Sequence, residues 1–212
     1  WQGIAETKDV ANQLSEIINK GRFERRGNPE FIQSNINRLS TNGRAYSLAI
    51  VQLRESGELA VPLMLDVLKD PTKQAQHGAI RRGIVDIGRY AVNPLVAATE
   101  TKDQQQLEIV IALLGNLGYD SAIPYLVRVL EAGPSDPVRA AATRALVQLK
   151  YPGDSTSADL FYDLSEKLYY DRSSLTADTR FPTANVWRSE EGKGLIRTTV
   201  PPAIFNEIMS MR

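Results

Sequence analysis

The strongest pattern in the sequence is a unit of two short apolar helices that recurs along most of the chain. Each unit opens at a proline, and the segment that follows it is apolar with a helical period. The prolines are Pro29, Pro62, Pro94 and Pro124, spaced 33, 32 and 30 residues apart. Because self-similarity at a fixed period of this length is typical of stacked repeat proteins, the pattern predicts a helical solenoid.

The connections between units carry a consistent signal of glycine and proline. Three units have a glycine five or six residues before the proline, namely Gly57, Gly88 and Gly118. Glycine tolerates the left-handed conformation in which many helices end, and proline fits the first turn of a helix. The pattern therefore predicts that each glycine ends one helix and each proline opens the next.

The second helix of each unit ends on an apolar residue at an equivalent position. Mostly small residues precede it by four and eight positions, and Gly83 is among them. A glycine inside a helix costs about 1 kcal/mol relative to alanine, so we expect close helix packing to require it. The predicted core consists of Ala79, Gly83, Ile87, Val110, Leu113, Leu117, Ala141, Ala145 and Leu149.

The last unit is the most regular. Its two helices read AIPYLVRVL from Ala122 and DPVRAAATRAL from Asp136. These two segments resemble the short HEAT-like repeat of phycobilisome lyases, and the resemblance extends over roughly residues 29–150. It implies an all-α, right-handed α-α superhelix in which the second helices line the concave side. It implies little about function, because one fold serves many unrelated roles.

The N-terminal end has a helical pattern of its own. The apolar residues Val10, Leu14, Ile17 and Ile18 predict a capping helix within residues 1–20, stopped by Gly21. We interpret the Arg25–Arg26 pair that follows as part of a solvated linker. Residues 1–150 are thus predicted to form one solenoid with an N-terminal capping helix.

Residues 151–212 lack the repeat and are predicted to form a separate C-terminal cap. A capping box of Thr156 and Asp159 predicts a helix that extends to about Tyr170. Two strands joined by a turn are then expected, at residues 185–188 and 195–200, followed by the start of a further helix after Pro202.

We expect this cap to cover the apolar flank of the last repeat. That flank would come from Val138, Ala142 and Leu146, and the apolar face of the capping helix would lie on it. Trp187, in the first strand, is predicted to be buried in the joint, because an isolated hairpin is marginal in water.

Composition excludes several kinds of chemistry. Lysine plus arginine and aspartate plus glutamate both number 25, so a neutral chain gives no general attraction to nucleic acid. No apolar run approaches 18 residues, which disfavours membrane insertion. Cysteine is absent, and His77 is the single histidine, so cysteine-based zinc sites, thiolate catalysis and clusters of histidine ligands cannot form. We predict no catalytic residues, no metal and no cofactor. The composition is compatible with either side of a membrane.

A row of polar residues on the second helices is the candidate binding site. These positions recur with the helical spacing of four, so they form one stripe on each helix. Stacked, the stripes would make a ladder of polar groups on the concave surface. The residues are Gln52, Arg82, Asp86, Glu108, Asn116, Arg144 and Gln148.

The sequence therefore predicts a non-catalytic scaffold that binds a protein or peptide, as one module of a longer bacterial protein. The alternatives are a HEAT-fold enzyme or chromophore-binding protein, such as a bilin lyase or a DNA glycosylase, and a purely structural spacer. A glycosylase is disfavoured because the repeat region has no tryptophan and the chain is neutral. The interpretation as an excised piece rests on the start at Trp1 and on an end within a helical pattern.

Overall fold

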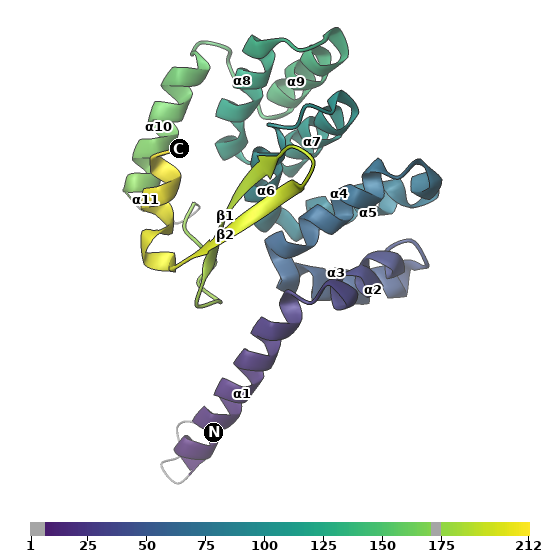
Figure 1. Ribbon diagram of the computed structural model, residues 1–212, viewed down its shortest axis with the longest axis vertical. Coiled ribbons are helices and arrows are strands. Elements are labelled where there is room, and N and C mark those ends of the chain that lie inside the picture. Colours follow the sequence, from purple (N-terminus) through teal and green to yellow (C-terminus); the bar gives the residue numbers. More distant parts are fainter. Residues whose placement is uncertain (1–6, 171–174) are drawn as a thin grey trace.

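A computed structural model of the chain describes residues 7–170 and 175–212, and its main body is a stack of helix pairs (Figure 1). The pairs are α2 (Pro29–Arg38) with α3 (Gly43–Ser56), α4 (Val61–Lys69) with α5 (Gln74–Ile87), α6 (Val92–Ala98) with α7 (Gln104–Leu117), and α8 (Ile123–Ala132) with α9 (Asp136–Gln148). The predicted all-helical repeat arrangement is confirmed, and no strand lies between Pro29 and Lys150, a span described throughout.

The predicted glycine signals mark the ends of the second helices. Gly57, Gly88 and Gly118 have φ angles of 56°, 73° and 76°. A short 3-10 turn then leads into the next pair. These turns are η2 (Gly57–Ala60), η4 (Gly88–Ala91) and η5 (Asp120–Ala122); another, η3 (Pro71–Lys73), precedes α5. The three inter-pair turns lie along one edge of the stack.

One apolar core runs through all four pairs. Of the nine core residues predicted from the sequence, seven are buried, and Ala79 and Leu117 are partly buried against the core. The close approach inferred for Gly83 is present. A Cβ atom at this position would lie 2.9 Å from Leu39 Cδ1 and 3.0 Å from Met64 Cε.

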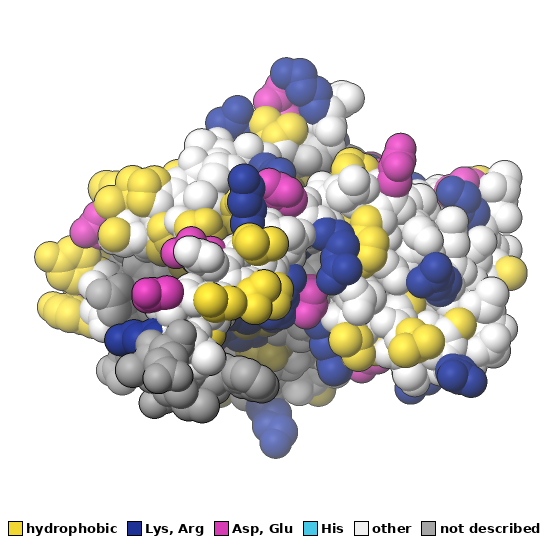
Figure 2. Space-filling model, turned by 90° about the horizontal axis from the view of Figure 1, so that it is seen from below, with side chains coloured by type: hydrophobic (Ala, Val, Ile, Leu, Met, Phe, Trp, Pro, Cys, Tyr) yellow, Lys and Arg dark blue, Asp and Glu magenta, His cyan; other side chains and the backbone are white. Residues whose placement is uncertain are grey.

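The N-terminal helix α1 (Lys8–Arg26) differs from the prediction in two ways. It does not stop at Gly21 but continues for five more residues. Its apolar residues Val10, Leu14, Ile17 and Ile18 are each more than half exposed, at 59%, 54%, 68% and 58%. Among the described residues nothing covers that face, and the helix projects beyond the stack (Figure 1). Figure 2 views the molecule from below and shows exposed hydrophobic side chains near the middle of the side that it presents.

The C-terminal segment contains the predicted elements. They are α10 (Ser157–Tyr169), β1 (Ala184–Glu190), β2 (Gly194–Val200), the turn η6 (Pro202–Ile204) and α11 (Phe205–Ser210). The strands pair antiparallel, with Ala184 opposite Val200 and Glu190 opposite Gly194. The capping box of Thr156 and Asp159 is formed.

The placement of this segment corrects the predicted cap. Helix α10 packs on α8, the first helix of the last pair, and Phe161 meets Tyr125 edge to face at 4.9 Å. Val138, Ala142 and Leu146 belong instead to the core of the stack, while Val147 on the outer side of α9 stays 71% exposed.

The hairpin returns along the edge formed by the inter-pair turns. It packs against α6, and Trp187 is buried at 4% exposure, as predicted. The Trp187 Nε1–H group donates a hydrogen bond of 2.8 Å to Glu58 in η2, so the C-terminal segment reaches back from the last pair to the second. Among the described residues, no helix has the length and apolar character needed to span a membrane.

Replacing Gly83 by leucine should destabilise the protein by about 1–3 kcal/mol, because the new side chain meets Leu39 and Met64. The matched control is Gly78→Leu in the same helix, where no atom lies within 4 Å of a Cβ. The control should be neutral or stabilising, since leucine favours helix more than glycine does. Denaturant midpoints test both variants, and equal midpoints would contradict the close packing.

Replacing Trp187 by alanine should cost about 3–5 kcal/mol of unfolding free energy, as for other deletions of buried aromatic side chains. Trp187→Phe should cost less, because one aromatic ring remains and only part of the buried volume is lost together with the donor to Glu58. Thermal denaturation of both variants checks the order. A melting temperature unchanged in Trp187→Ala would show that the hairpin does not hold the stack.

Candidate functional site

The predicted polar stripe lies on the outward face of the second helices. Gln52 comes from α3, Arg82 and Asp86 from α5, Glu108 and Asn116 from α7, and Arg144 and Gln148 from α9. Four of them, Arg82, Asn116, Arg144 and Gln148, are exposed, and the other three are half-buried. We refer to the outward surface of α3, α5, α7 and α9 as the second-helix face.

The part of the stripe on α5 is occupied by contacts within the protein. The Tyr46 hydroxyl donates a short hydrogen bond to Asp86 Oδ2, and Arg82 Nε lies 3.9 Å from the same oxygen. The Arg82 guanidinium also lies 4.8 Å from the centre of the Tyr46 ring. Burial and the hydrogen bond to Asp86 raise the pKa of Tyr46. These contacts join α3 to α5 and give Asp86 a structural role.

The part of the stripe on α7 and α9 lines a groove of about 590 Å³. Glu108, Asn116, Arg144 and Gln148 all contribute to its walls. Within the described part of the chain, none of these four side chains forms a hydrogen bond or an ion pair. The sequence thus predicted four residues that the structure places together, facing solvent, with their polar groups available.

The groove also contains residues that the sequence reasoning did not assign to it. They are Arg81, Gln105, Ile109, Ala112, Ala141 and Ala145. Ala141 and Ala145 were predicted only as core positions, yet small residues beside a polar stripe are a signal for a groove floor. Arg81 was missed because it lies one residue from the predicted stripe.

The floor is low because α7 and α9 approach each other closely. A Cβ atom on Gly115 of α7 would lie 2.9 Å from the Cα atom of Ala145 in α9. Such contact leaves no room for large side chains between the helix axes. Longer side chains such as Arg81 and Arg144 therefore form the margins of the groove, and alanines form its floor.

The described residues offer no site for a bound metal. No group of three or more histidine, aspartate or glutamate side chains is placed to hold one. His77, the single histidine, is half-buried, with Nε2 3.1 Å from the carbonyl oxygen of Asp70. Its contact is with the main chain of its own helix pair.

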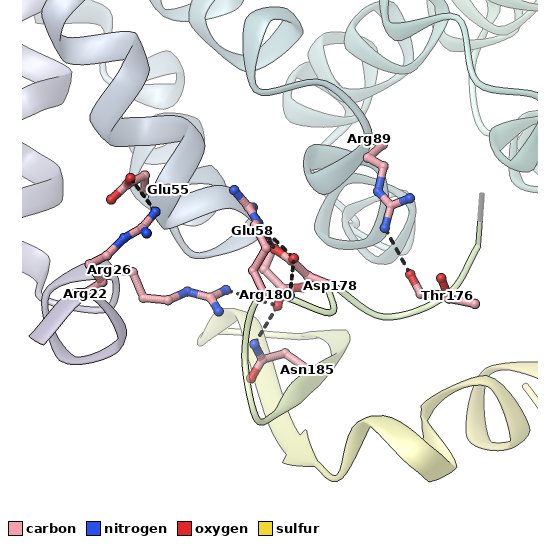
Figure 3. A network of polar contacts seen from close by, with 9 residues as sticks. All are labelled: Arg22, Arg26, Glu55, Glu58, Arg89, Thr176, Asp178, Arg180 and Asn185. Carbon is pink, nitrogen blue, oxygen red and sulfur yellow. Dashed lines mark hydrogen bonds and ion pairs between the residues drawn. The ribbon is translucent and has the colours of Figure 1, made fainter. Parts of the chain in front are cut away.

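A second polar cluster lies between the stack and the C-terminal segment (Figure 3). At its centre is Glu58, which accepts hydrogen bonds from Asn185 Nδ2 at 2.6 Å and from Trp187 Nε1 at 2.8 Å. Arg26 Nη2 lies 3.8 Å from the same carboxylate, and the Arg26 guanidinium stacks 3.4 Å from the centre of the Phe181 ring. Arg26 is only 5% exposed, so its interpretation as a solvated linker residue is wrong.

This cluster ties three distant parts of the chain together. Arg26 ends α1, Glu58 belongs to η2, and Asn185 and Trp187 lie in β1. The neighbouring cavity, which Arg89, Tyr90 and Tyr119 also line, measures about 80 Å³. Small-molecule sites usually measure about 300–1,000 Å³, so this cavity suits only a few water molecules.

Comparisons with known proteins agree with the fold. Residues 61–147 match the family of HEAT repeats. The matched segment contains α4 to α9 and nearly all of the residues that line the groove. A relative from Thermosynechococcus vestitus, phycocyanobilin lyase subunit beta, is 27% identical over 113 residues. The matched part is 53% of each protein, so the chain spans about half the length of this relative. No solved structure matches the chain significantly.

The Glu58 carboxylate should give the protein a distinctive pH dependence. Burial raises its pKa above 4.5, although the bonds from Asn185 and Trp187 and the charge of Arg26 lower it. A group with a raised folded-state pKa stabilises fully below its unfolded pKa and loses this effect as pH rises through the folded value. The difference in unfolding free energy between the wild type and Glu58→Gln should therefore shift in favour of the wild type as pH falls toward 4.5.

The matched control for this pH series is Glu131→Gln. Glu131 is exposed, and hydrogen bonds from Ser157 lower its pKa, so its contribution is lost as pH falls. Urea denaturation of the three proteins across the same pH range measures both trends. A difference for Glu58→Gln that stays constant with pH would contradict the raised pKa.

Proposed function

We propose that this chain is a non-catalytic interaction scaffold and that it binds a segment of a partner protein in the groove between α7 and α9. The observation that carries the proposal is the groove itself. Its floor is made of small residues that admit another main chain, and its walls carry Glu108, Asn116, Arg144 and Gln148, which have no partner within residues 7–170 and 175–212. Polar groups that are free to exchange water for a ligand can provide specificity at small desolvation cost.

The repeats support this function in general terms. Stacked helical repeats form extended surfaces that are used for binding, and HEAT repeats are present here over residues 61–147. The relative from Thermosynechococcus vestitus is named as a subunit, which describes a protein that works with another chain. The proposed binding surface lies within the segment that matches these repeats.

The proposal can be tested by filling the groove. Ala112 is exposed in α7 and lies in the groove, so Ala112→Tyr should block it without disturbing the core. Peptides selected from a phage-displayed library on the wild-type protein should lose at least about tenfold in affinity for this variant, a loss of roughly 1.4 kcal/mol. Isothermal titration calorimetry measures the change.

The control variant is Ala132→Tyr, at the exposed C-terminal end of α8 and outside the groove. It adds the same side chain and should leave the affinity of the selected peptides unchanged. Failure to select any peptide, or equal binding by Ala112→Tyr, would refute the proposed function.

Bilin binding is the second candidate, because the relative is named a phycocyanobilin lyase subunit. The groove of about 590 Å³ has the volume of a small-molecule site, whereas the cavity beside Glu58, at about 80 Å³, is too small for a tetrapyrrole. Titration with free phycocyanobilin should then change its visible absorption spectrum, and Ala112→Tyr should abolish the change. An unchanged spectrum with the wild type would exclude this candidate.

A further inference from the structure

The second-helix face has a charge character that the neutral chain as a whole does not. The helices α3, α5, α7 and α9 together carry six arginines and four carboxylates, and none of them contains a lysine. Arginine presents a planar fork of donors that matches a carboxylate in two parallel hydrogen bonds. A surface on which arginine is present and lysine is absent is therefore suited to carboxylate recognition.

Three of the four carboxylates on these helices already have cationic partners. Glu55 pairs with Arg22 and Arg25 of α1, at 2.8 and 3.8 Å. Asp86 is engaged by Arg82, and Asp136 pairs with Arg139 three residues along α9. Their negative charge is thus largely compensated within the protein, and Glu108 is the carboxylate that remains.

Three arginines on the same helices have no such compensation. Arg44, Arg81 and Arg144 form no ion pair or hydrogen bond within the described part of the chain, and all three are exposed. Arg81 and Arg144 line the groove together with Glu108, from α5 and α9 respectively. Because α7 lies between those two helices, the two free guanidinium groups come from either side of the alanine floor.

We infer that the partner segment bound in this groove is acidic, with carboxylate side chains that pair with Arg81 and Arg144 and small or apolar residues on the floor around Ala112. This inference rests on the proposed function and specifies its partner. Two observations favour a protein segment over nucleic acid. The uncompensated arginines are few, and no aromatic side chain lines the groove to stack a base.

The test uses three fluorescent peptides of equal length that repeat glutamate–alanine, glutamine–alanine or lysine–alanine. Fluorescence anisotropy with the full chain should show that the glutamate peptide binds at least about tenfold more tightly than the glutamine peptide, and that the lysine peptide does not bind. Raising the salt concentration should weaken the glutamate peptide, because exposed charges are screened.

A charge-neutralising double variant identifies the residues responsible. Arg81→Gln with Arg144→Gln should lower the affinity for the glutamate peptide by about tenfold or more. The matched control, Arg38→Gln with Arg188→Gln, removes the same charge from exposed residues of α2 and β1 and should leave the affinity within about twofold. Circular dichroism checks that both double variants fold. If the glutamine double variant does not fold, Arg81→Lys with Arg144→Lys is tested in its place.

The outcomes separate this inference from the proposed function. If library peptides lose affinity for Ala112→Tyr but not for the double glutamine variant, the groove is a binding site and the acidic partner is wrong. Equal binding of the glutamate and glutamine peptides would also overturn the inference. If free phycocyanobilin competes for the groove and the glutamate peptide does not bind, the occupant is a bilin. If the chain self-associates and the double variant abolishes this, the occupant is a second copy of the chain.

Discussion

The close contact between neighbouring helices of the stack is the constraint on which the rest of the structure depends. A Cβ atom on Gly83 of α5 would lie 2.9 Å from Leu39 at the end of α2 and 3.0 Å from Met64 in α4. A Cβ atom on Gly115 of α7 would lie 2.9 Å from Ala145 in α9. Such contact lets the pairs stack with one continuous core, as a solenoid requires. The same small residues determine the outer surface, because alanines between closely spaced helices leave a low floor and longer side chains at its margins.

A largely buried carboxylate holds the opposite edge of the stack. Glu58 is surrounded by groups from α1 and β1, and a buried charge is tolerated only where it is paired and hydrogen-bonded. Asn185 and Trp187 supply two donors, and Arg26 supplies the countercharge. Removal of one partner would leave the others inadequately satisfied, so the C-terminal segment, the stack and the end of α1 are held in one mutual arrangement.

The sequence predicted what depends on local conformation and missed what depends on distant contacts. Glycines with positive φ, prolines at helix starts and the hairpin were all found, because each has a local cause. The helical period showed that α10 has an apolar face but could not show that the face lies on α8 rather than on the outer flank of α9. Arg26 was interpreted as a linker residue, because no sequence pattern near it indicates that its guanidinium stacks on the distant Phe181 ring.

The candidate site shows the same division. A spacing of four residues correctly grouped Glu108, Asn116, Arg144 and Gln148, because each pair lies on one helix and the two helices are neighbours. The spacing also included Asp86, which the structure removes from consideration. Its partner Tyr46 lies on another helix, and a side chain-to-side chain bond between helices leaves no trace in the periodicity of either one.

The two long surfaces of the stack therefore have different capacities for binding. Along the edge of the inter-pair turns, the C-terminal segment covers the polar groups, and Glu58 takes its donors from within the chain. A partner at this edge would have to displace bonds already made, at the desolvation cost of each group left unpaired. Along the second-helix face, Arg81 and Arg144 form no hydrogen bond or ion pair within the described part of the chain, so acceptors of a partner would break no internal bond of these two side chains. A partner on the second-helix face would therefore displace fewer internal contacts, and there the small residues that stabilise the stack also open a groove to solvent.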